Sequence, residues 1–269
     1  AAACAAKASL ASTRSRSPTL QPAFSRAFWL AGIGPVPITA GSTPATAPLT
    51  TVASTGRPRL SASARVVSTS AAAPSFTPPD CGGYNARARI TTDVDAARAL
   101  LAEAGFPAGR GLPVFPVQVQ NDSTYPRIME AIQAMWLKEL GVRSTIEPFE
   151  QKTWVQNQQS KQHVIGLMGW TGDYPDPLTF LGLFRGDGGN NWTGWASAAY
   201  DQLITETERT ADAAQRLELF QRAEALLLQE VPVTPLVFGS RTYLIHPSVR
   251  GWEPSPLGLH RFQLIELRD

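Results

Sequence analysis

Residues 163–177, HVIGLMGWTGDYPDP, join a strongly apolar run directly to a loop rich in Gly, Asp and Pro. The run at 163–170 has the length and apolar content of a buried β-strand. The loop that follows places Asp173 and Asp176 next to Trp170, Tyr174 and two prolines, which stop a strand and favour turns. This stretch therefore predicts a strand buried in a sheet, with a polar loop at its carboxyl end.

Helices and strands alternate on both sides of this stretch. Asp93 or Thr92 is expected to cap a helix that ends before Gly105, and apolar residues at helical spacing predict another helix from Pro126 to Gly141. A further helix is expected at 151–159, two more after residue 196, and strands at 114–119, 142–147, 233–238, 243–245 and 262–267. Such alternation predicts an α/β fold, with a mixed or parallel sheet and helices on both faces.

Composition and charge exclude several classes of protein. The 269 residues are 43% hydrophobic and 17% charged, which suffices for one large or two ordinary domains. No stretch approaches the roughly 18 to 20 unbroken apolar residues of a membrane-spanning helix, so a polytopic membrane protein is excluded. Residues 1–79 carry seven Lys or Arg and no acid, whereas residues 80–269 hold 17 basic and 22 acidic side chains. This acidic part has no basic stripe with interleaved aromatic residues, so no nucleic-acid partner is expected.

The first 74 residues differ from the rest in composition. Ala, Ser, Thr, Pro, Arg and Gly make up 57 of them, and no apolar period is sustained, so we expect residues 1–74 to be a low-complexity, disordered or non-native segment. The apolar patch at 27–40 resembles a signal-peptide core, but Pro35 and Pro37 interrupt it and it begins far from the start. We therefore interpret it as a non-targeting segment. A truncated or wrongly framed gene end would produce this composition.

Signatures of catalysis and cofactor binding are missing from the sequence. It contains no GxSxG elbow, no GxxxxGK[ST] phosphate loop and no GxGxxG between a strand and a helix. The three histidines, His163, His246 and His260, are isolated from other metal-ligating residues. We expect no cofactor and no metal site.

The loop that begins at residue 171 is the best candidate for a functional site. It follows the carboxyl end of a predicted strand, where ligands bind in open α/β sheets. Asp173, backed by Trp170 and Tyr174, would make a counter-charge for a ligand ammonium group. Two alternatives stay open: Asp173 and Asp176 could be turn formers and helix caps, or a carboxylate pair of a carbohydrate-active enzyme. In the enzyme, three tryptophans would serve as sugar platforms: Trp170, Trp192 and Trp195.

A series of motifs resembles the extracellular solute-binding proteins of family 5, which include the oligopeptide-binding receptors of ABC importers. In chain order they are FTPPDCGGY (76–84), ARALLAEAGFP (97–107), RIMEAIQAMWLKELGV (127–142), GWTGDYPDPLTFL (169–181), NNWTGW (190–195), AAYDQLI (198–204) and RLELFQRAEALLLQEVPVTPL (216–236). The resemblance covers about residues 75–269, the carboxyl-terminal half of such a protein. It implies a lobe of the periplasmic-binding-protein type II fold, without the first lobe.

The resemblance also implies a ligand site. Asp173 matches the family aspartate that holds the α-ammonium group of a bound peptide, Trp170 and Thr171 would lie beside the ligand backbone, and Tyr174 would shape the same wall. Three further residues match the family's pocket loop: Asn190, Asn191 and Trp192. The implied function is a monomeric, non-enzymatic substrate-binding component that delivers peptides to the membrane permease of an ABC importer. Nickel complexes, haem or oligosaccharides are alternative ligands within the family.

The same resemblance divides the chain and sets its expected location. Residues 75–235 would form the second lobe, and residues 236–269 would be return strands that belong to the hinge and the first lobe. Without that lobe we expect these strands to lack sheet partners and the chain to bind peptide weakly. A truncated gene product without a present function is the remaining alternative. The implied location is periplasmic or otherwise extracytoplasmic, with a membrane anchor allowed in a longer parent, although this chain shows no convincing signal peptide.

Overall fold

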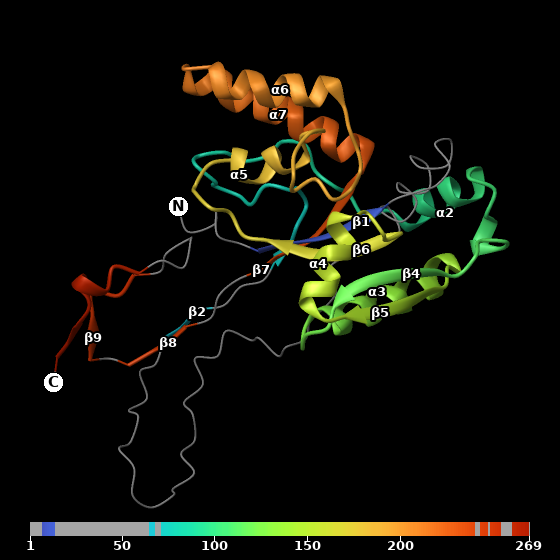
Figure 1. The fold of residues 1–269 in the computed structure, drawn as a ribbon, viewed down its shortest axis with the longest axis horizontal. Helices are drawn as coiled ribbons and strands as arrows, with labels where there is room; N and C mark the ends of the chain where they lie inside the picture. The colour runs from blue at the N-terminus through green and yellow to red at the C-terminus, as the bar shows by residue number, and fades with distance from the viewer. Residues whose placement is uncertain are drawn as a thin grey trace, which may run out of the picture.

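A six-stranded mixed sheet forms the centre of the protein (Figure 1). The computed structural model describes residues 7–13, 65–67, 71–239, 243–246, 248–253 and 260–268. The strands of this sheet are β1 (Lys7–Thr13), β3 (Ala71–Ala72), β4 (Phe115–Gln120), β5 (Ser144–Phe149), β6 (Ile165–Trp170) and β7 (Val233–Gly239). Their order is β3-β7-β1-β6-β4-β5. β4 is parallel to β5 and β6, whereas β1 is antiparallel to β6 and β7, and β3 is antiparallel to β7.

The helices follow the predicted alternation. They are α2 (Val94–Glu103), α3 (Tyr125–Leu140), α4 (Gln151–Gln159), α5 (Leu178–Leu181), α6 (Ala198–Arg209) and α7 (Ala213–Glu230), with short 3-10 turns η1 (Pro107–Gly109), η2 (Gly182–Phe184) and η3 (Phe262–Leu264). Asp93 caps α2 by accepting a hydrogen bond from the amide of Ala96 at 2.9 Å, as predicted. Gly141 ends α3 at a φ of 68°, a left-handed conformation that glycine adopts without strain.

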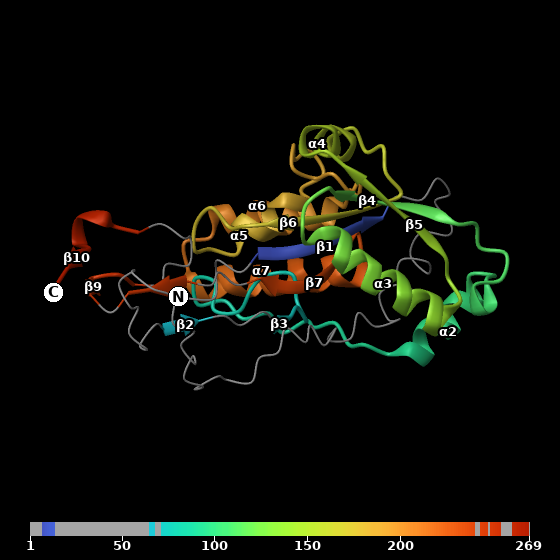
Figure 2. The same ribbon diagram turned by 90° about the horizontal axis from the view of Figure 1, so that it is seen from below.

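Different helices cover the two faces of the sheet. Val117 and Val119 of β4 are buried in a core with α2 and α3. Between them, Gln118 points to the other face, where its Oε1 accepts a hydrogen bond from Gln158 of α4 at 3.2 Å. On β6, Leu167 belongs to the α3 core, and Met168 packs against a second core built with α5, α6 and α7. Figure 2 shows α2 and α3 below the sheet and α4 above it. The predicted α/β fold with helices on both faces is confirmed.

The segment before residue 75 contributes to this sheet, which differs from the expectation that it lacks structure. β1 lies between β6 and β7 and pairs with both, so Ala8 faces Trp170 in the register of one pair and Phe238 in that of the other. Because neighbouring backbones supply these hydrogen bonds, a strand can form here without an apolar period. Residues 14–64, which include the signal-like patch at 27–40, lie outside the described residues.

The strands after residue 232 also differ from expectation, because they have partners. β7 pairs with β1 and β3, so the expected boundary between residues 235 and 236 falls inside a strand. β8 (Tyr243–Ile245) pairs with β2 (Arg65–Val67), and β9 (Val249–Arg250) pairs with β10 (Glu266–Leu267). The strand expected at 262–267 is reduced to β10, since residues 262–264 form the turn η3.

Candidate functional site

The first loop of the site, residues 171–177, follows Trp170 at the end of β6 and is held by Thr179 of α5. The indole Nε1 of Trp170 donates to the carbonyl oxygen of Thr179 at 2.9 Å, and the hydroxyl of Thr179 accepts from the backbone amide of Asp173 at 2.9 Å. Thr179 is buried, whereas Trp170 and Thr171 are half-buried. One threonine therefore fixes both the end of the strand and the backbone of Asp173.

Asp176 holds this loop onto the helical layer. Its Oδ1 accepts from the amide of Leu178 at the start of α5 at 2.9 Å, so it acts as a local turn and cap residue. Both carboxylate oxygens also bind the guanidinium group of Arg216 on α7, at 2.6 and 2.9 Å. The two side chains are only 27% and 26% exposed, and such a bidentate, partly desolvated pair is stronger than an exposed one.

Arg216 joins the loop to both long helices. Its Nε donates to the carbonyl oxygen of Thr207 on α6 at 3.0 Å, and its guanidinium carbon lies 4.8 Å from the centre of the Phe220 ring. The hydrogen bonds to Asp176 raise the pKa of Arg216 further, against the opposing effect of burial. Arg216 therefore keeps its charge and fixes the loop relative to α6 and α7.

Asp173 and Tyr174 occupy the open side of the loop. Both are exposed, and in the described part of the chain the Asp173 carboxylate has neither an ion pair nor a side-chain hydrogen bond. Burial, followed by the negative charges of Asp176 and Asp173, raises the pKa of Tyr174, so its hydroxyl is protonated at neutral pH. The loop thus presents a carboxylate next to a neutral phenol.

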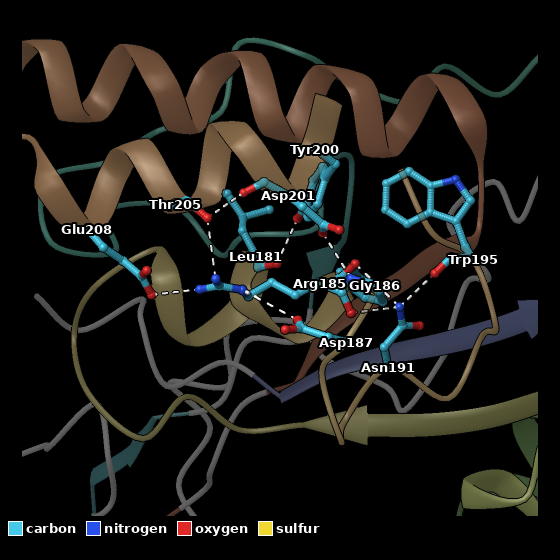
Figure 3. Close-up of polar contacts among 11 residues, drawn as sticks. Leu181, Arg185, Gly186, Asp187, Asn191, Trp195, Tyr200, Asp201, Thr205 and Glu208 are labelled. Atoms are coloured by element: carbon cyan, nitrogen blue, oxygen red, sulfur yellow. Dashed lines mark hydrogen bonds and ion pairs between the residues drawn. The ribbon is translucent and has the colours of Figure 1, made fainter. Parts of the chain in front are cut away.

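The second predicted loop, which contains residues 190–192, is held together by hydrogen bonds of a buried side chain. Asn191 is buried, and its Nδ2 donates to the carbonyl oxygens of Arg185 at 3.0 Å and Trp195 at 2.8 Å (Figure 3). Its Oδ1 accepts from the hydroxyl of Thr193 at 2.7 Å. Because these bonds occupy the amide on both sides, Asn191 shapes the loop.

The two sequence neighbours of Asn191 differ: Trp192 packs against α4, whereas Asn190 is exposed. Trp192 is half-buried, and its ring packs edge-on against Trp154 of α4, with ring centres 6.1 Å apart. Its Nε1 donates to the carbonyl oxygen of Gly189 at 3.1 Å. Asn190 is exposed. Of the three predicted residues, Asn190 is the one whose side chain faces solvent.

Arg185 attaches this second loop to α6. Its guanidinium group binds Glu208 at 2.9 Å and the hydroxyl of Thr205 at 3.3 Å (Figure 3). The amide of Gly186 adds a bond to Asp201 at 2.9 Å. The loop is therefore fixed by polar contacts along one helix face.

A buried carboxylate on α7 binds residues 76–84, the segment that lies next to the first loop. Glu224 of α7 is fully buried, and its Oε1 accepts from the amides of Phe76 at 2.7 Å and Thr77 at 2.9 Å, while its Oε2 accepts from the hydroxyl of Tyr84 at 2.8 Å. Burial raises the pKa of Glu224, although these hydrogen bonds oppose the shift. The anchored segment reaches the first loop at Gly82, where an added Cβ would lie 2.6 Å from the carbonyl oxygen of Pro175.

Sequence reasoning missed the roles of the arginines that hold the two loops. Arg216, Phe220 and Glu224 follow one another at intervals of four residues on α7, in the stripe that faces the core. A charged residue in such a stripe needs a partner, so the spacing of Arg216 was an available signal. Arg185 lies in a loop and carries no comparable signal.

The carboxylate pair of the enzyme alternative is not available in this arrangement. Asp176 is bound by Arg216 through both oxygens, which removes it from general acid or base chemistry. The indole groups of Trp170 and Trp195 are bonded to Thr179 and Glu230, and the Trp195 ring packs on Tyr200 with ring centres 5.0 Å apart. These contacts disfavour the interpretation of these residues as catalytic acids and sugar platforms.

Comparisons with known proteins bear on the class of this lobe. Residues 62–192 match the family model described as bacterial extracellular solute-binding proteins, family 5 Middle. The oligopeptide-binding protein OppA of Bacillus subtilis (strain 168) is 34% identical over 152 residues, which cover 56% of this chain and 28% of that protein. The dipeptide-binding protein of Escherichia coli (strain K12) is 30% identical over 197 residues, which cover 71% of this chain and 37% of that protein.

Solved structures agree on the fold. The crystal structure of a periplasmic oligopeptide-binding protein from Borrelia burgdorferi superposes with a TM-score of 0.78 at 24% identity, covering 99% of this chain and 49% of that one. The fold is thus that of a periplasmic-binding-protein lobe. The family resemblance drawn from the motifs is confirmed: residues 62–192 match the model of the family 5 extracellular solute-binding proteins, a family of binding proteins rather than enzymes.

The match is partial in length. The chain spans about a third of these curated relatives and about half of the solved structure. Within the described residues, no helix is long and apolar enough to cross a membrane.

Proposed function

We propose that this chain is part of the substrate-binding component of an ABC importer and that it captures peptides by their α-ammonium group and backbone. The observation that carries the proposal is the exposed Asp173 carboxylate, which has no ion pair in the described part of the chain and stands on a loop fixed by Thr179 and Asp176. A preorganised anion next to a half-buried indole suits a ligand ammonium group. The names of the relatives, oligopeptide- and dipeptide-binding proteins, point to the same ligand class.

The residues around Asp173 would have distinct roles. Trp170, the last residue of β6, and Thr171, which follows it, would lie beside the ligand backbone, and the neutral hydroxyl of Tyr174 would complete the same wall. Pairing with ligand backbone accommodates varied side chains. Asn190 would contact the ligand from the second loop, whereas Asn191 and Trp192 would hold that loop in shape.

Location and partners follow from the same proposal. The protein would act in the periplasm or an equivalent space, as a monomer that delivers ligand to a membrane permease. Since Asp173 is exposed, an ammonium group bound there stays in contact with water, and an exposed pair contributes roughly 0 to 1 kcal/mol. This chain alone should therefore bind peptide weakly, and micromolar binding of a tri- to pentapeptide in calorimetry would contradict that expectation.

The proposal is tested by comparing a tripeptide that has a free amino terminus with its N-acetylated form. Wild-type chain should prefer the free form by about 1.4- to 5-fold, the range typical of a measurable exposed ion pair. Asp173→Asn should abolish the preference without changing the melting temperature. Asp95→Asn, a change at an exposed carboxylate on α2, should keep it. Equal binding of the two peptides by wild-type chain would refute the role of Asp173.

A second experiment separates peptides from the other family ligands. Mass spectrometry of ligand that co-purifies with the protein, in this chain or in a longer protein that contains it, should detect short peptides. A nickel complex, haem, an oligosaccharide or another non-peptide ligand would replace peptide transport as the function.

A further inference from the structure

The negative charges of three carboxylates act on the phenol of Tyr174. After burial, the pKa of Tyr174 is raised by Asp176, by Asp173 and, last in size, by Glu208 of α6, whereas Arg216 lowers it. These side chains come from the first loop and from both long helices. The open side of the site therefore experiences the sum of several charges rather than that of Asp173 alone.

Two of these three carboxylates have an arginine partner. Asp176 is bound by Arg216 at 2.6 and 2.9 Å, and Glu208 is bound by Arg185 at 2.9 Å (Figure 3). Both arginines are largely covered, at 26% and 28% side-chain exposure. In the described part of the chain, Asp173 has no such partner.

We propose that Arg216 and Arg185 set the charge selectivity of the ligand site. Arg216 neutralises Asp176, and Arg185 pairs with Glu208 as well as with the exposed Asp187. Within the first loop this leaves Asp173 as the carboxylate without a cationic partner in the described part of the chain, so the site fits a peptide with one positive charge at its amino-terminal residue. A peptide whose first residue adds a side-chain cation gains no second anion to pair with. This inference rests on the proposed function and assigns two positioning residues to it.

The size of the effect follows from Coulomb's law. Loss of the Arg216 charge leaves Asp176 as a second uncompensated anion. For a ligand cation roughly 10 Å away, one extra unit charge changes binding by about 2-fold at the dielectric constant of water and about 15-fold at the lower effective value of a protein surface. The preference for a dication should therefore rise by a factor between these limits, and added salt should reduce it.

The test uses the peptides Ala-Ala-Ala and Lys-Ala-Ala, with affinities measured by NMR titration at low salt. The quantity compared is the ratio of the two dissociation constants, because a merely structural defect weakens both peptides together. Arg216→Gln should shift the ratio by about 2- to 15-fold in favour of Lys-Ala-Ala. The double variant Asp176→Asn/Arg216→Gln should return it to the wild-type value, since the pair is neutral again.

Controls distinguish this inference from the proposed function. Arg87→Gln removes an arginine from an exposed ion pair with Glu218 and should leave the ratio unchanged. If Arg216→Gln does not fold, Arg185→Gln replaces it, with a smaller shift because Glu208 affects Tyr174 least. An unchanged ratio in the folded variant, or a shift that persists in the double variant, overturns the charge selectivity alone. Wild-type chain that binds neither peptide overturns the proposed function and this inference together.

Discussion

Substitution of Glu224 by Ala should destabilise the protein by about 3 to 5 kcal/mol. Its carboxylate is the acceptor for the amides of Phe76 and Thr77 and for the hydroxyl of Tyr84, all buried. Each buried donor left without an acceptor lowers stability by about 1 to 3 kcal/mol. The total stays below the sum for three donors, because water that enters the space of the missing side chain would accept from some of them. Because domains of this size are stable by only about 5 to 15 kcal/mol, the loss should be large in relative terms.

Urea denaturation followed by circular dichroism measures this loss. The matched control is Glu218→Ala, on the same helix, whose carboxylate pairs with Arg87 at the surface and should contribute roughly 0 to 1 kcal/mol. A loss below about 1 kcal/mol in Glu224→Ala would refute the reasoning, since it would mean that the three donors do not depend on this carboxylate.

The pH dependence of Glu224→Gln provides a second check on the same group. Burial raises the pKa of Glu224 in the folded state above its unfolded value, so the folded state holds the proton more tightly. Its contribution to stability is therefore fully present below the unfolded pKa and is lost as the pH rises through the folded pKa. The stability difference between wild-type protein and Glu224→Gln should shrink as the pH rises from acid to neutral. Growth of the difference would show that the hydrogen bonds outweigh burial.

Three further substitutions test the loops. Gly82→Ala should lower the free energy of unfolding by about 1 to 3 kcal/mol, because the residue has a φ of +60° and its Cβ would meet the carbonyl oxygen of Pro175. Chemical denaturation measures this loss, and an unchanged midpoint would contradict the close approach. Asn191→Ala should lower the free energy of unfolding by about 2 kcal/mol in the same assay, since the carbonyl groups of Arg185 and Trp195 lose their donor. Unchanged stability would show that the loop keeps its shape without the Asn191 amide. Arg216→Lys should lower stability by about 1 kcal/mol, because an ammonium group cannot replace the two parallel bonds to Asp176, and equal thermal stability would count against the bidentate pair.

Local signals in the sequence located most of the elements that form the site. The predicted strand at 163–170 corresponds to β6, the cap at Asp93 was correct, and Gly141 ends α3 as expected. In each case neighbouring residues determine the outcome: an apolar run, a side chain that reaches an amide two or three residues on, or a glycine with a positive φ.

These local signals could not predict contacts between residues that are far apart in the sequence. Sequence reasoning assigned Asn191 to the ligand pocket, yet the structure buries its amide among backbone carbonyl groups within its own loop. Two of its alternatives grouped Asp173 with Asp176, as turn formers or as a catalytic pair, and the bidentate bond from Arg216, forty residues later, separates the two carboxylates. β1 was missed for the same reason, because its pairing depends on two strands more than 150 residues away.

The position of β1 makes the amino-terminal segment a structural requirement. β6 and β7 do not pair with each other, and β1 alone bridges them among the described strands. A chain trimmed before residue 65, in the laboratory or by a protease, would split the sheet into two parts and open one long edge on each. Open edges recruit other chains, so such a product should precipitate or self-associate rather than behave as a smaller version of the lobe.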